Sequence, residues 1–224
     1  MDAILVPQTP DIVAEANHRI ANSLTLLVSM VRMQGVAVKK NPVTLTNAEV
    51  RLLLDGIAAR INTIAQLHRL LSHSAADGVI SLRPHLQEIT EALVTALSSP
   101  EQSARVVHTG GDCMVQMRHV QPIVLILCEI FINAMKYAHP AGVPLVMMVD
   151  CSVGADGLLV LTISDDGVGL PENHDPQKVQ GMGFRVMRSL ATEIGAELQM
   201  QSTHLGLTFR LSVPAGAMTG AKLA

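Results

Sequence analysis

The segment CEIFINAMKYAHPAG (residues 128–142) is the stretch on which the fold of this chain most depends. Its apolar residues are spaced as in a helix, and Glu129 and Asn133, four residues apart, would project from the same side of that helix. A carboxylate and an amide presented together suit a hydrated Mg²⁺, which takes oxygen ligands and keeps several waters. Lys136 follows one turn later, where a cation can meet a phosphate. An ordinary amphipathic helix with Glu and Asn at its polar edge gives the same pattern, so this segment alone leaves both interpretations open.

A predicted strand downstream of this helix ends in the segment ISDDGVGLPE (residues 163–172), which contains Asp165, Gly167 and Gly169. Glycine lets the backbone approach a ligand closely, and a carboxylate at a strand end can accept a hydrogen bond from an amino group such as that of adenine. A simple turn between two strands would also use an Asp-Gly pair.

A second glycine pair, Gly181 and Gly183, follows an irregular polar loop and stands at the start of a predicted helix. Free N–H groups and the helix dipole favour phosphate at such a position. Two glycine elements that bracket a loop, after a helix with the E-x-x-x-N pattern, favour a nucleotide site more strongly than either element does alone.

Toward the N-terminus, apolar spacing predicts two long amphipathic helices, over residues 11–34 and 47–71, with Asn47 as the N-cap of the second. Their short connection predicts an antiparallel hairpin. One hairpin cannot cover both apolar stripes, so either a second copy completes a four-helix bundle or the rest of the chain packs against it. The predicted stripe of the second helix consists of Val50, Leu53, Leu54, Ile57, Ile61, Ile64, Leu67 and Leu71.

The first of these helices carries Glu15, His18 and Asn22 on one strip, on the side opposite to its apolar residues. An exposed neutral imidazole is a competent nucleophile near neutral pH, and a neighbouring carboxylate can orient it or take its proton. A polar helix face that merely contains a histidine is the alternative. The eight other histidines of the sequence show no metal-ligand spacing and are interpreted as structural or surface residues.

Residues 72–78 (SHSAADG) look like a domain joint, and beyond them the pattern changes to mixed helices and strands. Helices grouped with a mostly antiparallel sheet predict a two-layer α/β sandwich. The expected helices cover 82–97, 120–138 and 183–194, and the expected strands cover 105–109, 114–118, 144–153, 158–164, 197–202 and 207–213.

Composition limits the classes of function. A net charge of −3 and an aromatic content of 2% argue against nucleic-acid binding, which needs basic surfaces and stacking platforms. Three widely spaced cysteines predict unlinked thiols in a reducing compartment and no structural zinc site. The opening residues do not read as a signal peptide, and no run of about 18 apolar residues predicts a membrane span. We therefore expect a cytoplasmic protein.

Taken in order, these motifs resemble those of histidine kinases of the HisKA_2/HWE type. HRIANSL resembles the family's phosphoacceptor segment H-R-x-x-N-x-L, and EIFINAMKYA resembles its N-box. DDGVG and GMGF resemble its two glycine boxes, and GLTFRLSVP resembles its closing strand. The order and spacing hold from about residue 11 to residue 214.

The resemblance implies a dimerisation and phosphotransfer hairpin (11–75), a GHKL-type (Bergerat) ATP-binding domain (79–214) and a flexible tail (215–224). It implies that His18 accepts the γ-phosphoryl group of ATP. Arg19 stands where the commonest histidine kinases have an acid, so Glu15 is the nearest candidate base. The other implied roles are Mg²⁺ binding for Glu129 and Asn133, phosphate contact for Lys136, Gly181 and Gly183, adenine recognition for Asp165, and shaping of the adenine pocket for Gly167, Gly169 and Thr208.

The function implied is that of a sensor histidine kinase core that phosphorylates His18 and passes the group to an aspartate on a response-regulator receiver domain. We expect a homodimer, although a monomer shielded by its own ATP domain is the alternative, and a sensory domain that is separate or missing. A phosphotransfer or scaffold protein that does not turn over ATP is the main rival. An anti-sigma type of GHKL serine kinase is a weaker one, because the hairpin carries the H-R-x-x-N strip.

Overall fold

The computed structural model describes residues 44–71, 78–100, 102–140, 142–154, 157–171 and 182–214, with scattered helical positions between 21 and 39 and the backbone alone at 48, 70, 71 and 182. The helices are α2 (Asn47–Leu71), α3 (Arg83–Leu97), α4 (Met117–Tyr137) and α5 (Met182–Glu193). The strands are β1 (Val79–Ser81), β2 (Ala104–Gly110), β3 (Met114–Gln116), β4 (Leu145–Val153), β5 (Leu159–Asp165), β6 (Glu197–Thr203) and β7 (Gly206–Val213).

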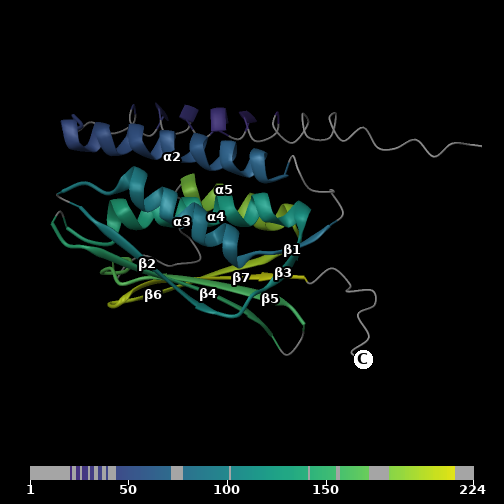
Figure 1. Cartoon of the computed structure of the whole chain (residues 1–224). Helices are drawn as coiled ribbons and strands as arrows, with labels where there is room; N and C mark the ends of the chain where they lie inside the picture. The colour runs from purple at the N-terminus through teal and green to yellow at the C-terminus, as the bar shows by residue number, and fades with distance from the viewer. Residues whose placement is uncertain are drawn as a thin grey trace, which may run out of the picture.

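These elements form layers (Figure 1). A five-stranded sheet carries α3, α4 and α5 on one face, and α2 lies on the outer side of those helices. In β4, the side chains of Leu145, Met147, Val149 and Cys151 are buried and alternate with more exposed ones, as expected when one face of a sheet is covered by helices. The predicted helices and sheet of a two-layer α/β sandwich are confirmed, and α2 adds a further helical layer.

The sheet has the strand order β2-β4-β5-β7-β6, and β1 pairs with β3 in a separate two-stranded sheet. The β2–β4 pair is parallel, and the other pairs of the large sheet are antiparallel, which confirms the mostly antiparallel prediction. A parallel pair needs a crossover connection, and α4 lies within the segment that joins β2 to β4. The helix with the E-x-x-x-N pattern is therefore held against the middle of the sheet.

Helix α4 is the centre of the core. Its side chains from Val120 to Ile132 are nearly all buried, so it contacts the sheet on one side and the other helices around it. Among the described residues it is the helix with the length and apolar composition to cross a membrane, but 78% of its apolar window is buried inside the protein. A core helix surrounded by other elements passes the same test.

Helix α2 begins with a capping box. The hydroxyl of Thr46 accepts a hydrogen bond from the Glu49 N–H (3.2 Å), and the Glu49 carboxylate accepts one from the Thr46 N–H (2.7 Å). Thr46 is thus the N-cap, and the prediction of Asn47 is wrong by one residue. Asn47 is the first residue of the helix because the reciprocal bonds need a Glu three positions after the cap.

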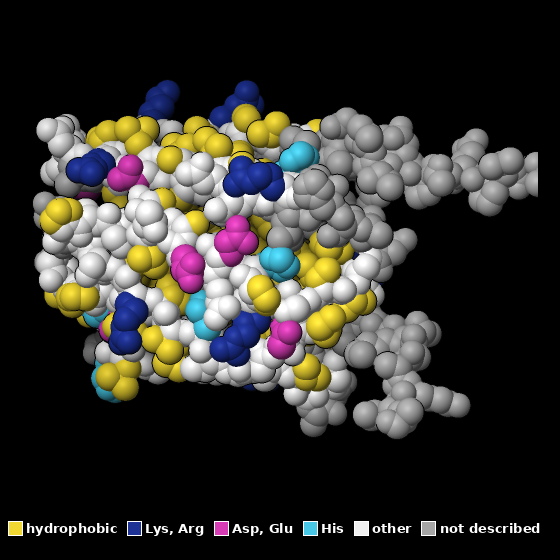
Figure 2. Space-filling view, in the orientation of Figure 1, with side chains coloured by type: hydrophobic (Ala, Val, Ile, Leu, Met, Phe, Trp, Pro, Cys, Tyr) yellow, Lys and Arg dark blue, Asp and Glu magenta, His cyan; other side chains and the backbone are white. Residues whose placement is uncertain are grey.

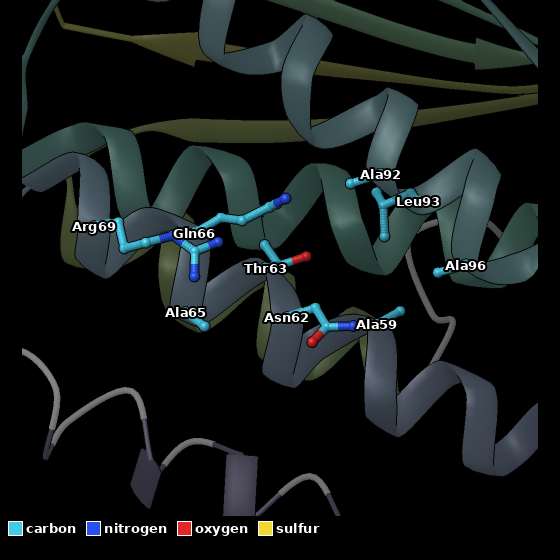
Figure 3. A pocket seen from close by; sticks show the side chains of 9 residues that line it. All are labelled: Ala59, Asn62, Thr63, Ala65, Gln66, Arg69, Ala92, Leu93 and Ala96. Carbon is cyan, nitrogen blue, oxygen red and sulfur yellow. The ribbon is translucent and has the colours of Figure 1, made fainter.

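The buried face of α2 differs from the predicted stripe. Ile64 and Leu67 are buried, but Val50, Leu54 and Ile61 are exposed, because the helix turns a narrower face toward α3 and α4. That face consists of small and polar residues with a few apolar ones, namely Gly56, Ala59, Arg60, Thr63, Ile64 and Leu67. The helical positions between 21 and 39 lie on the side of α2 away from α4 (Figures 1 and 3).

Cys113 and Cys151 form a disulfide between the loop before β3 and strand β4, with Cα atoms 6.2 Å apart. Cys128 is free and buried in α4. The expectation of three unlinked thiols is therefore wrong for this pair, because the fold brings together two cysteines that are 38 residues apart in the sequence.

Candidate functional site

The first part of the candidate site lies where α4 meets the start of α5. Glu129 is 2% exposed, and Asn133 is half-buried one turn further along α4. Gly183 in the first turn of α5 lies against this pair, since a Cβ atom there would be 3.0 Å from Asn133 Nδ2 and 3.3 Å from Glu129 Oε2. Any larger residue at 183 would push against the two side chains, so glycine allows the N-terminus of α5 to close on them.

Glu129 forms a buried ion pair with Arg60 that was not predicted from the sequence. Arg60 of α2 donates from Nε to Glu129 Oε1 (2.5 Å) and from Nη2 to Oε2 (2.9 Å), and its Nη1 donates to the Gly56 carbonyl (3.0 Å). Burial alone would lower the pKa of Arg60, but the hydrogen bonds and charge of Glu129 outweigh burial and raise that pKa. The guanidinium is thus fixed as a cation, and both oxygens of Glu129 are engaged.

Lys136 lies beside the same cluster. A Cβ atom on Gly56 would be 3.3 Å from Arg60 Nη1 and 4.0 Å from Lys136 Nζ, so both cations approach one point on α2. Burial lowers the pKa of Lys136, and the charge of Arg60 lowers it further against the opposing effect of Glu129. Counting the described residues, these two cations and the Glu129 carboxylate leave an excess of positive charge, which is suited to phosphate.

The second part of the site lies at the end of β5, around Asp165. This carboxylate is 8% exposed, and its Oδ1 accepts hydrogen bonds from the N–H groups of Gly167 (2.9 Å) and Leu207 (3.2 Å). Burial raises the pKa of Asp165, although the two N–H groups oppose that effect. No described residue donates to Oδ2, so that oxygen is the one suited to an amino group of a ligand.

Glycines allow the chain to pass closely around Asp165. Gly169 has φ +71°, and a Cβ atom there would lie 2.1 Å from the Thr203 carbonyl oxygen. Gly206 has φ +122°, and a Cβ atom there would lie 2.0 Å from the Asp165 carbonyl oxygen. At Gly167, a Cβ atom would lie 2.7 Å from the backbone of Ala138. Only glycine fits these three positions.

The two parts of the site share helix α4. Gly183 approaches Asn133, and Gly167 approaches Ala138 five residues later, a separation of about 7.5 Å along the helix axis. The adjacent Asp166 strengthens this junction, because its Oδ1 accepts hydrogen bonds from His139 Nε2 (2.8 Å) and the Val146 N–H (3.0 Å). Burial alone would raise the pKa of Asp166, but these two bonds and the charge of His139 lower it.

The structure brings together most of the residues predicted from the motifs. Glu129, Asn133, Lys136 and Gly183 gather at the junction of α4 and α5, and Asp165, Gly167 and Gly169 gather at the end of β5. Thr208 is half-buried in β7, where it pairs with Ser164 and Gln201. Glu15, His18, Asn22 and Gly181 lie outside the described residues, so their roles stay predictions.

Sequence reasoning did not identify Arg60, His139 or Gly206. A sequence signal for Arg60 was present in Gly56, one turn before it. A glycine in mid-helix costs about 1 kcal/mol of helix stability, so its presence suggests that another group packs closely against that face of the helix. Among the described residues, no three His, Cys, Asp or Glu side chains gather as a preformed metal site. A hydrated Mg²⁺ bound chiefly through one or two side chains and phosphates does not need one.

Comparison with known proteins agrees with this geometry. The HisKA_2 family, described as histidine kinase, matches residues 15–97, and the family described as histidine kinase-, DNA gyrase B- and HSP90-like ATPase matches residues 119–217. The two matches lie one after the other along most of the chain, and together they support its similarity to histidine kinases of the HisKA_2/HWE type with a GHKL-type ATPase domain.

Among curated relatives, the chain is 26% identical over 206 residues to blue-light-activated histidine kinase 2 of Erythrobacter litoralis, covering 90% of this chain and 56% of the relative. It is 25% identical over 210 residues to sensor histidine kinase PdtaS of Mycobacterium tuberculosis, covering 91% of this chain and 39% of the relative. The chain therefore spans about half the length of these relatives.

Among solved structures, the chain resembles the histidine kinase domain of the Erythrobacter litoralis blue-light activated kinase, with a TM-score of 0.63, 23% identity, and coverage of 92% of this chain and 95% of that one. At this identity the likeness concerns the fold, and it supports the predicted combination of helices with a GHKL sandwich.

The described residues fit an adenine nucleotide, and the Arg60–Glu129 ion pair bears on where its metal ion can bind. Asp165 offers a buried acceptor, and the close-packed glycines leave its surroundings narrow. Asn133 stands beside the N-terminus of α5, a position that favours phosphate. Glu129 fits a hydrated Mg²⁺ only after Arg60 has released its carboxylate.

Proposed function

We propose that this chain is the kinase core of a two-component sensor histidine kinase, which phosphorylates its own His18 from Mg·ATP. The observation that carries the proposal is the approach of Gly183 to Asn133 and Glu129, because it places a helix N-terminus, an amide and a carboxylate at one point. Phosphoryl transfer depends mainly on such positioning and on neutralising charge.

Each residue has a chemical role in this proposal. Asp165 would accept the adenine amino group, with Gly167, Gly169 and Thr208 around it. Asn133 and Glu129 would hold the Mg²⁺ and its water shell, and Lys136, Gly181 and Gly183 would contact phosphates. Bound Mg²⁺ supplies charge neutralisation on the phosphates. These assignments rest on the motifs and are supported by the burial and contacts of the described residues.

The proposed reaction joins His18 to the γ-phosphorus. A neutral imidazole nitrogen attacks, the P–N bond forms as the P–O bond to ADP breaks, and the imidazole proton passes to a base, for which Glu15 is the nearest candidate. An aspartate carboxylate oxygen of a receiver domain then attacks the phosphorus as the P–N bond breaks, and a proton returns to the imidazole nitrogen, which restores neutral His18. We further propose a cytoplasmic homodimer that works with such a receiver domain. Its chain would be organised as a hairpin (11–75), an ATP domain (79–214) and a tail (215–224).

The test is incubation with Mg²⁺ and ATP labelled on the γ-phosphate, with the wild type beside His18→Ala and Asn133→Ala. We expect an acid-labile, alkali-stable label that is absent from both variants, because one lacks the acceptor and the other a metal ligand. Label that persists in His18→Ala would contradict the assignment of the acceptor.

A second candidate function is favoured by the Arg60–Glu129 ion pair. A phosphotransfer protein that does not turn over ATP would relay phosphate through His18, and a metal ligand held by a guanidinium suits a silent nucleotide site. Absence of nucleotide binding, with His18 still phosphorylated by a separate phosphodonor, would favour this function.

A further inference from the structure

The Arg60–Glu129 ion pair joins α2 to the helix that carries the proposed metal ligands. The two side chains are 69 positions apart in the sequence, and their exposures are 5% and 3%. The guanidinium engages both carboxylate oxygens and satisfies a third donor on the Gly56 carbonyl. In this arrangement each carboxylate oxygen of Glu129 already accepts a hydrogen bond from a cation, and a metal ion at Glu129 would meet the charge of Arg60.

Packing between α2 and α3 is incomplete next to this ion pair. A cavity of about 230 Å³ lies between the two helices, with Ala59, Ala92 and Ala96 among its walls (Figure 3). Gln66 also lines it, and the Oε1 atom of Gln66 is buried without a hydrogen-bond partner among the described residues. Small side chains, a void and an unsatisfied oxygen make the contact between α2 and α3 loosely packed, so α2 is held here with less packing than a filled interface would give.

The charges around the ion pair favour exchange of partners. Arg60 and Lys136 both approach Gly56, and among the described residues the carboxylate that pairs with Arg60 is that of Glu129. Phosphates at Asn133 and Gly183 would compensate the excess positive charge, and a divalent cation at Glu129 would repel the guanidinium. A bound nucleotide would thus offer phosphate to Arg60 and Lys136, and its metal ion would take the place of Arg60 at Glu129.

We propose that Arg60 competes with Mg²⁺ for Glu129, so that α2 is docked on the ATP domain in the nucleotide-free state and is released when Mg·nucleotide binds. The proposal rests on the proposed function, because it assumes nucleotide at this site. It gives α2 an autoinhibitory contact: a hairpin that carries the acceptor histidine is held in place until the metal site is filled.

The first experiment measures binding of Mg²⁺ with a non-hydrolysable ATP analogue by calorimetry, to the full chain and to Arg60→Gln. We expect the variant to bind about tenfold more tightly, corresponding to 1.4 kcal/mol, and the gain to vanish in EDTA, because only the metal competes with Arg60. Arg51→Gln is the matched control, since Arg51 lies on the same helix in an exposed ion pair with Asp55. Arg60→Lys keeps the charge but loses the bidentate geometry and should fall between wild type and Arg60→Gln.

The second experiment measures the position of α2 directly. Spin labels on exposed positions of α2 and β7, through Ala58→Cys and Arg210→Cys, should give one narrow distance distribution without nucleotide. Mg·analogue should change that distribution in the wild-type background, and Arg60→Gln should broaden it before any ligand is added. This readout does not depend on kinase activity.

The outcomes separate the two proposals. Equal affinities for wild type and Arg60→Gln, or a label distance unaffected by saturating Mg·analogue, would overturn the competition by Arg60 and leave the proposed function intact. Binding by neither protein, with both folded by circular dichroism, would overturn the proposed function and this inference with it. Binding by Arg60→Gln alone would support the competition in its strongest form.

Discussion

At the scale of single residues, Asp165 combines a charge with a buried position. Burial raises its pKa, so the folded state holds its proton more tightly than the unfolded chain does. Ionisation of this group therefore favours unfolding, and that effect develops as pH rises from the unfolded pKa of about 3.9 through the raised folded value.

Asp165→Asn should separate stability from binding. Asn keeps an oxygen for the N–H groups of Gly167 and Leu207 and removes the buried charge, so unfolding by urea at pH 7 should show no loss of stability. An amide nitrogen in place of the second oxygen would oppose an adenine amino group, and nucleotide affinity should fall roughly tenfold or more, as for loss of a hydrogen bond to a charged group. A stable variant with unchanged affinity would remove Asp165 from the adenine site.

Gly169 and Gly157 can be compared to measure how much stability is lost when a side chain is added at a site of close backbone contact. Both have positive φ, but a Cβ atom at Gly157 meets nothing within 4 Å, and one at Gly169 meets the Thr203 carbonyl oxygen at 2.1 Å. Gly157→Ala should cost about 1–2 kcal/mol of unfolding free energy for its backbone conformation alone. Gly169→Ala should cost clearly more in the same urea titration. Equal losses would mean that the loop shifts easily away from the added methyl group.

The motif residues could be predicted because each motif is local. Glu129 and Asn133 share one helix face, and Asp165 ends a strand next to its glycines, so spacing alone brings each group together. Arg60 could not be predicted in the same way. Its partner is 69 residues away, and only the docking of α2 on α4 determines the pair.

At the scale of elements, the start of α2 depends on two reciprocal hydrogen bonds. Thr46→Ala would remove the hydroxyl that accepts the Glu49 N–H, and the protein should lose about 1 kcal/mol of stability in thermal unfolding. The hydrogen bonds from Thr46 lower the pKa of Glu49, so this cap contributes above the unfolded pKa of Glu49 and weakens as pH falls through the lowered folded value. Asn47→Ala is the control, and a greater loss there than in Thr46→Ala would restore Asn47 as the cap.

Most elements of the ATP domain followed from apolar periodicity, but the shortest did not. Strand β1 has three residues, too few for a period of two to be recognised, and its pairing with β3 is not local. The predicted strand 114–118 ends early, because helix α4 begins at Met117. Residues 117 and 118 suit either structure, and burial of Met117 in the core decides in favour of the helix.

At the scale of the whole molecule, the outer side of the helical layer is apolar. Val50, Leu54 and Ile61 on α2 and Leu24 and Val28 before it are 41–61% exposed. Figure 2 shows hydrophobic side chains along this edge. Docking of α2 on its own ATP domain, one of the two arrangements considered from the sequence, therefore leaves apolar surface that a second copy would cover.

We predict a homodimer that Leu54→Glu dissociates. Leu54 is 61% exposed, so a charge there should leave the fold intact while it disrupts an apolar contact between copies. Light scattering at micromolar concentration should change from the mass of two chains to that of one. Leu205→Glu, at a residue 71% exposed in the β6–β7 turn, is the control. A wild-type mass of one chain would exclude the dimer at that concentration.

The disulfide between Cys113 and Cys151 encloses the whole of α4 in a covalent loop. Under mechanical pulling from the two chain ends, the 38-residue separation between these cysteines could not extend while the bond is intact. The stretched chain should then be shorter by about 130 Å than after reduction, at about 3.5 Å per residue. In single-molecule force spectroscopy, the helix that carries Glu129 and Asn133 would therefore lie in the segment between the two cysteines, whose unravelling depends on redox conditions.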